Sequence, residues 1–217
     1  MQLELRVFPR SILPHVTGQL ILELSPPAPP TFDNFVAGAN AAAVASVRAA
    51  VRGAGERAVY LWGDAASGRS HLLAAAARTA GVVTCDDVHL LDDAGQIEAF
   101  DAFNRARAAG VAFIAAGDAP PAQLAVRADL RTRLGSGLVF QLHALGDEAK
   151  AGALRAQAAS RGMTLPDDVA GYLLRRLPRD LGTQLAVLDA LDRYSLAQKR
   201  ALTLPLVREA LEALGVK

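Results

Sequence analysis

A glycine-rich stretch between Leu61 and Leu73, LWGDAASGRSHLL, contains the residues of this sequence that are best suited to phosphate chemistry. Gly63 and Gly68 enclose four residues, and a basic residue and a hydroxyl follow directly. In such a loop the glycines let successive backbone N–H groups point into one concavity, and the N-terminus of the next helix adds a favourable dipole for phosphate. The spacing therefore predicts a nucleotide-binding loop. Its expected members are Gly63, Asp64, Ala65, Ala66, Ser67, Gly68, Arg69, Ser70 and His71.

Arg69 occupies the position at which a phosphate loop usually carries lysine. A planar guanidinium can bind phosphate oxygens bidentately, whereas lysine is a compact, mobile charge that can follow the transferring phosphoryl group. We therefore expect a nucleotide to bind here and its turnover to suffer. The alternative is an ordinary strand-to-helix turn with no ligand.

Asp86 and Asp87 follow a second apolar stretch, residues 82–85. A phosphate-loop hydrolase needs a carboxylate at the end of a neighbouring strand, where it organises magnesium and water. We expect Asp86 to hold Mg²⁺ through water, with the Ser70 hydroxyl as a second ligand, and Asp87 to lie nearer the attacking water. An acidic helix cap is the alternative, because the residues after Asp87 continue apolar.

Short apolar runs alternate with helical patterns over residues 31–146. This alternation predicts a mainly parallel α/β sheet. Asp86 follows Ser70 by only sixteen positions, which is too few for a helix, a further strand and a second helix. We therefore expect the sheet to lack an edge strand. The expected strands are residues 58–62, 82–85, 111–116 and 138–142.

Proline-rich and turn residues, and a change of hydrophobic pattern, predict three regions in the chain. Residues 1–30 form an extended tail that ends in a stiff proline-rich linker, SPPAPP. Residues 31–146 form the α/β domain, and residues 147–217 form a small helical domain. Its expected helices run from Asp147, as a cap, to about 160, from 166 to about 178, from 181 to 194, and from 204 to 214.

Composition excludes several classes of protein. The chain has 217 residues, is 52% hydrophobic and carries 23 basic against 22 acidic side chains, so no overall basic field indicates direct DNA binding. Cys85 is the single cysteine, which excludes an internal disulfide and a cysteine-cluster metal site. With neither a signal peptide nor a long apolar run, we expect a cytoplasmic protein with no membrane partner.

Several motifs, taken in order, resemble the AAA+ module of the bacterial replication initiator DnaA and, more closely, the short DnaA-related regulators of the Hda family. The resemblance covers about residue 19 to the C-terminus and implies an AAA+ P-loop domain followed by a small α-helical lid. Arginine at the lysine position of the loop is usual in the Hda branch. The motifs are TFDNFV (31–36), WG…GRSHLL (62–73), CDD (85–87), GDAPPAQL (117–124) and DLRTRLG (129–135).

The resemblance implies roles for further residues. Phe35 and Val36 would lie beside the adenine pocket, and Asp118 would be the polar sensor. Arg133 matches the arginine finger, a guanidinium offered to a neighbouring subunit's nucleotide. The alternatives are a turn residue for Asp118 and a surface arginine for Arg133. Gly182 stands where the family carries its second-sensor arginine, which weakens the expectation of autonomous ATP hydrolysis.

The tail contains the segment QLILEL, residues 19–24, which resembles the peptide with which Hda proteins bind the DNA polymerase III β sliding clamp. An extended peptide of this kind places alternate apolar side chains in a pocket while the glutamine makes a polar contact. An amphipathic strand is the alternative, and QLEL at residues 2–5 is a partial second copy. The expected clamp-binding residues are Gln19, Leu20, Leu22 and Leu24.

Together these patterns and the resemblance predict a clamp-dependent adaptor that holds ADP or ATP with Mg²⁺ and stimulates hydrolysis of the ATP bound to DnaA. Such a protein would regulate replication initiation negatively and would meet DNA only through the clamp. Two alternatives stay open, a free-standing P-loop ATPase and a nucleotide-free interaction scaffold. The oligomeric state, including a homodimer, also stays open.

Overall fold

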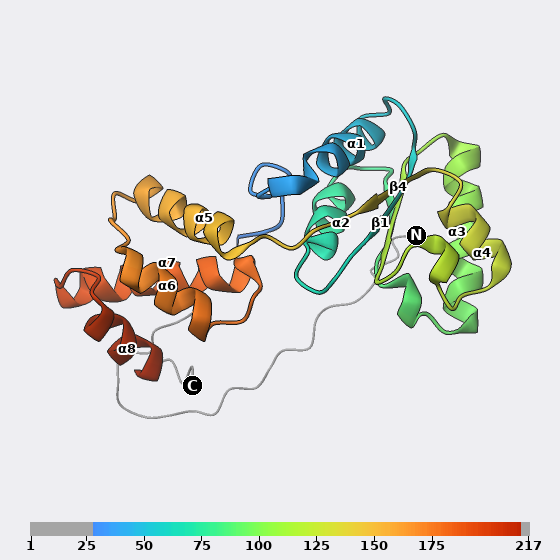
Figure 1. Ribbon diagram of the computed structural model, residues 1–217. Helices are drawn as coiled ribbons and strands as arrows, with labels where there is room; N and C mark the ends of the chain where they lie inside the picture. The colour runs from blue at the N-terminus through green and yellow to red at the C-terminus, as the bar shows by residue number, and fades with distance from the viewer. Residues whose placement is uncertain (1–27, 214–217) are drawn as a thin grey trace.

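The computed structural model describes residues 28–213, in which an α/β domain is followed by a helical domain (Figure 1). The clamp-type segments at residues 2–5 and 19–24 lie outside the described residues. The α/β domain contains η1 (Gly38–Asn40), α1 (Ala41–Val51), β1 (Ala58–Trp62), α2 (Arg69–Ala77), β2 (Val83–Cys85), η2 (Val88–Leu90), α3 (Asp93–Ala109), β3 (Phe113–Gly117), η3 (Pro121–Gln123), α4 (Ala128–Leu134) and β4 (Leu138–Gln141). The helical domain contains α5 (Asp147–Ser160), α6 (Asp167–Arg176), α7 (Leu181–Gln198) and α8 (Leu204–Ala213).

The strands form one parallel sheet in the order β2-β3-β1-β4, which confirms the predicted α/β class. Ala58 of β1 pairs with Phe113 of β3, and Trp62 pairs with Gly117, so the two central strands begin and end together. Because all the strands run the same way, the segments that follow β1, β2 and β3 meet at one edge. Within the described residues the sheet has four strands, and β2, the strand before the two aspartates, lies at its margin.

Helices cover both faces of the sheet, with α1 and α2 on one face and α3 and α4 on the other (Figure 1). Side chains of successive strand residues point to opposite faces of the sheet, so each strand contributes to the hydrophobic core on either face. Val59 and Leu61 of β1 pack with the first helix pair, whereas Tyr60 packs with Phe103 and Leu130 of the second pair. The two central strands, β1 and β3, are therefore buried on both faces, in keeping with their continuous apolar runs, whereas Leu138 and Val139 of the edge strand β4 are exposed.

Local signals fix several helix ends. The Asp92 carboxylate accepts the N–H of Gly95 at 2.8 Å at the start of α3, and the carboxylate of Asp180 accepts the N–H of Thr183 at 2.7 Å at the start of α7. The expectation that Asp147 caps α5 is wrong, because Gly146 occupies the cap position and makes no side-chain bond there. Asp147 is instead the first helical residue, where its charge still favours the helix dipole.

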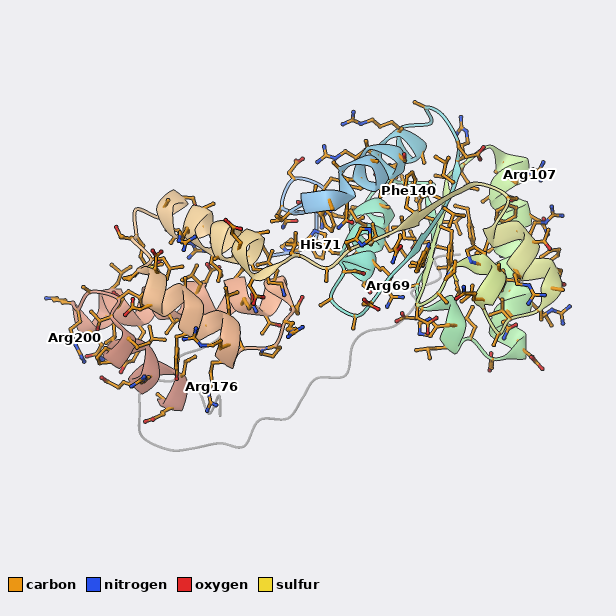
Figure 2. All side chains as sticks on the ribbon, viewed as in Figure 1. Arg69, His71, Arg107, Phe140, Arg176 and Arg200 are labelled. Atoms are coloured by element: carbon orange, nitrogen blue, oxygen red, sulfur yellow. The ribbon has the colours of Figure 1, made fainter. Side chains whose placement is uncertain are left out.

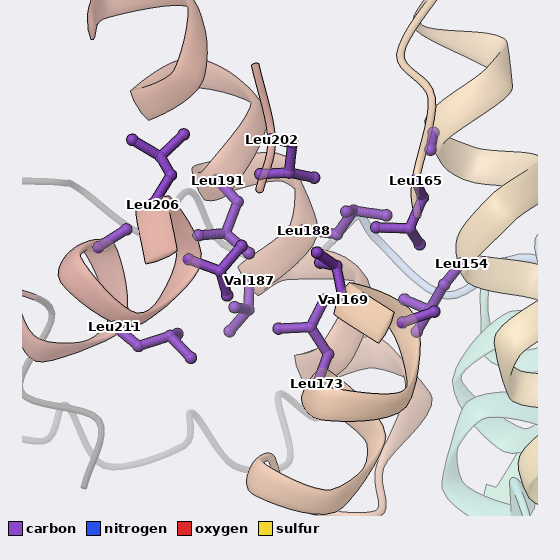
Figure 3. Close-up of a cluster of buried hydrophobic side chains, with 14 of the residues drawn as sticks. Leu154, Leu165, Val169, Leu173, Val187, Leu188, Leu191, Leu202, Leu206 and Leu211 are labelled. Carbon is purple, nitrogen blue, oxygen red and sulfur yellow. The ribbon is translucent and has the colours of Figure 1, made fainter. Parts of the chain in front are cut away.

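The four lid helices enclose a separate core of leucine and valine side chains, which Figure 3 shows in close-up. Leu154, Val169, Leu173 and Leu188 have no exposed surface, and α8 closes the cluster with Leu206. In the described part of the chain, no helix is both long and apolar enough to span a membrane.

Two hydrogen bonds fasten the start of the α/β domain to the segment that leads into the lid. The Asn40 amide donates to the His143 carbonyl and accepts the His143 N–H, each at 2.8 Å. Asn40 is buried, with 3% of its surface exposed, although 103 positions separate the two residues. This pair holds the connection between the sheet and α5 against η1.

Candidate functional site

The predicted phosphate loop connects β1 to α2 at the carboxyl edge of the sheet, and its backbone requires both glycines. Gly63 has φ 155°, and an added Cβ would lie 2.2 Å from the Leu142 carbonyl oxygen. Gly68 has φ 97°, and an added Cβ would lie 2.6 Å from the ring of Phe35. Side chains are therefore excluded at both positions, by the left-handed backbone and by these close approaches.

The loop carries polar groups that the protein itself leaves unsatisfied. The hydroxyl of Ser67 and one terminal nitrogen of Arg69, Nη1, are buried and have no hydrogen-bond partner among residues 28–213. The first N–H groups of α2 have no intrahelical acceptor, as at any helix start. Buried donors of this kind are rare without a reason, and phosphate oxygens would satisfy all of them. The residues present therefore fit a bound nucleotide phosphate.

Arg69 lies at the start of α2, at the carboxyl edge of the sheet (Figure 2), and is largely buried, with 13% of its side chain exposed. Its second terminal nitrogen, Nη2, lies 3.9 Å from Oδ1 of Asp87, which is the outer limit of an ion pair. Arg69 also lowers the pKa of the Tyr60 phenol, although burial and Asp118 raise that pKa more strongly. The guanidinium thus lies among the groups that follow the three neighbouring strands.

Asp86 and Asp87 lie at the end of β2, as predicted. Asp86 is exposed, and its Oδ1 accepts the N–H of Asp87 at 2.9 Å. Asp87 has a left-handed backbone, φ 46°, which turns its side chain toward Arg69. Residues 28–213 contain no group of three or more His, Cys, Asp or Glu side chains that could hold a metal ion. Phosphate oxygens and water supply most ligands of a loop-bound Mg²⁺, so Ser70 and Asp86 stay predictions for that role.

His89 and Tyr60 join this edge although the sequence patterns assign them no specific role. Asp118 follows β3, and its Oδ1 lies 3.8 Å from Nδ1 of His89, a buried nitrogen without a hydrogen-bond partner. The Tyr60 hydroxyl donates to the Ala119 carbonyl at 2.8 Å and holds the turn that carries Asp118. In a parallel sheet the carboxyl ends of neighbouring strands lie together, and this rule could have predicted from the sequence that His89 and Asp118 are close.

The segment 31–36 packs directly against the loop, as expected for a wall of the nucleotide pocket. Nε2 of His71 lies 2.9 Å from the Thr31 carbonyl, and the rings of His71 and Phe35 meet edge to face at 5.3 Å. Val36 is half-buried beside them. The segment that follows the proline-rich linker therefore contacts the first turn of α2.

Arg133 lies on α4 at the opposite, amino edge of the sheet. Its guanidinium carbon is 5.7 Å from the ring centre of Phe100 and 5.9 Å from that of Phe103. It has no carboxylate partner among residues 28–213, whereas Arg127 pairs with Asp129 at 2.9 Å. Its own carbonyl accepts the hydroxyl of Ser136, a residue that lies beside the first residues of β1 and β3. The length of β1, about 13 Å, therefore separates Arg133 from the loop.

Gly182, which stands at the second-sensor position, is the second residue of α7. An added Cβ would meet only the Asp180 carboxylate, at 3.5 Å, an ordinary contact. The backbone therefore does not require glycine here.

Comparison with solved structures defines the class. Domain III of the Thermotoga maritima replication initiation protein DnaA has a TM-score of 0.68 at 19% identity over 89% of this chain and 100% of that one. DnaA from Aquifex aeolicus bound to AMPPCP gives 0.61 at 19% identity over 82% of this chain and 70% of that one. The Thermotoga maritima RuvB Holliday junction branch migration motor gives 0.62 at 16% identity over 87% and 73%. The fold is that of the AAA+ proteins.

The helical domain narrows this class. Residues 147–211 match the family model described as the lid domain of Hda. The DnaA-like fold and the match of the helical domain to the Hda lid model are both consistent with the Hda-like, DnaA-related protein that the sequence motifs predict.

Proposed function

We propose that this protein is a clamp-dependent adaptor that stimulates hydrolysis of the ATP bound to DnaA and so limits initiation of chromosomal replication. One observation carries the proposal: within the described residues, a predicted phosphate loop with unmet donors lies at one edge of the sheet, and an arginine without a carboxylate partner lies at the other. One molecule can therefore hold its own nucleotide while Arg133 faces that of a partner.

The phosphate loop serves in this account to retain ADP or ATP rather than to hydrolyse it. Ser67, Arg69 and the N-terminus of α2 supply donors to phosphate oxygens. The arginine fork favours stable bidentate binding over the mobility that phosphoryl transfer asks of lysine. A bound nucleotide would contact these donors through its phosphates and would lie beside the wall formed by segment 31–36.

Arg133 acts in trans as the arginine finger. A guanidinium that enters a neighbouring nucleotide site stabilises the charge that spreads over the transferring phosphoryl group. The rings of Phe100 and Phe103 support it by cation–π contact and hold the side chain at the sheet edge without neutralising its charge. The Hda-type lid and the DnaA-like fold support DnaA as the partner.

Residues 19–24 attach the adaptor to the sliding clamp, so DNA is contacted only through the clamp. The proposal rests on the spacing of Gln19, Leu20, Leu22 and Leu24 before a proline-rich linker. The linker leads to Thr31, whose carbonyl contacts His71 of the loop helix. Clamp attachment and nucleotide site are thus adjacent along the chain.

A reconstituted assay with clamp loaded on DNA and ATP-bound DnaA tests the two parts separately. We expect Arg133→Ala to lose stimulation while it still binds the clamp, and a double substitution of Gln19 and Leu22 by alanine to lose both. If Arg133→Ala stimulated as well as the unaltered protein, the finger assignment would be wrong. If the double variant kept clamp binding, residues 19–24 would not be the attachment.

An autonomous ATPase is the second candidate, because Asp87 reaches within 3.9 Å of Arg69 in the same site. In that case the purified chain would hydrolyse Mg-ATP without DnaA or clamp, and Asp87→Asn would abolish the activity. For the third candidate, a vacant scaffold, extraction of the purified protein would release no nucleotide.

A further inference from the structure

A pocket of about 430 Å³ opens at the amino edge of the sheet, away from the phosphate loop. Its walls come from the starts of β1 and β3 and from α3, and the function proposed above uses only one of its lining residues, Phe103, which contacts Arg133. The residues that line it are Gly55, Glu56, Arg57, Ala58, Phe103, Arg107, Val111, Phe113 and Ser136.

The pocket and Arg133 share two residues. Phe103 lines the pocket and also lies under the Arg133 guanidinium, 5.9 Å from it. Ser136 lines the pocket and donates its hydroxyl to the Arg133 carbonyl at 2.7 Å. The pocket and the Arg133 side chain are therefore neighbours, so a molecule seated on Arg133 lies close to the pocket.

The charged side chains of the pocket differ in whether they have hydrogen-bond partners. Arg57 donates to the carbonyls of Gly53, at 3.2 Å, and Gly110. One carboxylate oxygen of Glu56 accepts the N–H groups of Arg57 and Ala58 at 3.0 and 3.1 Å. The side chain of Arg107, which is exposed near the C-terminal end of α3, has no hydrogen bond or carboxylate partner in residues 28–213. Figure 2 shows Arg107 and Arg69 toward opposite ends of the α/β domain.

We propose that Arg107 and this pocket receive an acidic side chain of the AAA+ subunit whose nucleotide Arg133 reaches. The proposal rests on the proposed function, because it needs a partner seated on Arg133. The occupant comes from that partner because the pocket and the finger have common walls. It is acidic because Arg57 and Arg107 outnumber Glu56, and because a free guanidinium binds carboxylate bidentately.

Arg107 would be a positioning residue, since it reaches the partner protein and not the reacting phosphate. Charge contacts at the margin of an interface set the strength and rate of association. Arg107 should therefore govern how much adaptor is needed, whereas Arg133 governs how fast the bound complex hydrolyses ATP.

Titration of the full chain against ATP-loaded DnaA, with clamp on DNA, separates the two roles. We expect Arg107→Glu to raise the concentration for half-maximal stimulation about tenfold, with the maximal rate unchanged, and Arg107→Gln to raise it about threefold. Arg78→Glu, the same charge change on the exposed end of α2, is the matched control and should leave both values unaltered. An unchanged half-maximal concentration for Arg107→Glu, a fall in maximal rate alone, or an equal effect of Arg78→Glu would overturn the proposal.

Photocrosslinking from position 107, with benzoylphenylalanine in place of arginine, identifies the occupant directly. We expect ATP-dependent crosslinks to the AAA+ domain of DnaA. Crosslinks only to residues 1–27 of the same chain, to a second copy, or to the clamp would assign the pocket to that occupant and overturn the proposal. If the unaltered protein fails to stimulate DnaA, or Arg133→Ala stimulates fully, the proposed function itself fails. If the unaltered protein and Arg133→Ala behave as expected but Arg107→Glu leaves the half-maximal concentration unchanged, only the inference about the pocket fails.

Discussion

A substitution of Arg69 can distinguish a role in nucleotide binding from a role in folding. Its Nη1 is buried without a partner, and its nearest carboxylate, Asp87, is 3.9 Å away. A buried donor left unsatisfied costs about 1–3 kcal/mol of folding free energy, so a nucleotide-free loop would cost the fold some stability. A phosphate would relieve that cost.

Truncation of Arg69 should therefore act on binding and not on the fold. We expect Arg69→Ala to leave the nucleotide-free melting temperature unchanged or higher and to weaken ADP binding at least about tenfold. Calorimetric titration and thermal melting with and without ADP measure both. A lower melting temperature without nucleotide, together with undiminished ADP affinity, would show that Arg69 is a structural residue.

Cys85 provides a pH-dependent reporter at the end of β2. Burial, with a smaller contribution from Asp86, raises the pKa of its thiol to about 11 from an ordinary value of 9.0. The neutral thiol is favoured in the folded state, so this contribution to stability is complete below pH 9 and disappears as the pH rises to about 11. Thiol modification of the folded protein should stay slow at pH 9, where the unfolded chain reacts readily. Equal rates for the two states would contradict the shift.

At the scale of elements, the connection between sheet and lid depends on the Asn40–His143 pair. Asn40→Ala removes both hydrogen bonds and leaves the His143 backbone without its partner, so we expect a loss of about 1–3 kcal/mol in the free energy of unfolding. Urea denaturation measures it. Asn104→Ala, on α3, is the control, because the Asn104 side chain has no hydrogen bond within residues 28–213, and it should change stability by less than about 0.5 kcal/mol. Equal effects of the two substitutions would remove the proposed role of the pair.

The start of α7 tests whether Gly182 is retained for folding. Because its backbone is ordinary and an added Cβ would be only 3.5 Å from Asp180, we expect Gly182→Ala to stabilise the lid by about 0.5–1 kcal/mol. Unfolding of the two proteins in urea decides the matter. A destabilised variant would mean that glycine is needed at this point, and its departure from the family pattern would then be structural.

Most of the helices and strands were predictable from the sequence. Apolar runs and turn residues located the four strands and the lid helices within a few positions, because buried parallel strands and amphipathic helices have different periods. The sequence could not pair Asn40 with His143 or bring His89 to Asp118, because those contacts depend on the register of strands far apart in the chain. The Asp147 cap failed for a local reason, since the helix starts one residue earlier than the acidic signal implies.

For the whole molecule, the main feature is the separation of two charged sites by the sheet. Residues 63–71 lie at its carboxyl edge, and Arg133, Arg107 and their pocket lie at its amino edge. The spacing of residues 63–71 predicts a phosphate loop, whereas no sequence pattern predicts the pocket, because its lining comes from four separate parts of the chain: residues 55–58, α3, residues 111–113 and Ser136. In the proposed function, this separation lets residues 63–71 hold the chain's own nucleotide while Arg133 meets that of a neighbouring AAA+ subunit.

The most direct measurement follows ATP labelled in its terminal phosphate and bound to DnaA before mixing. With clamp on DNA and less adaptor than DnaA, we expect the unaltered chain to release labelled phosphate through repeated encounters. Arg133→Ala should slow this release at least about tenfold, while the chain alone hydrolyses no Mg-ATP at a comparable rate. Equal release with Arg133→Ala, or rapid hydrolysis by the chain without DnaA, would contradict the account.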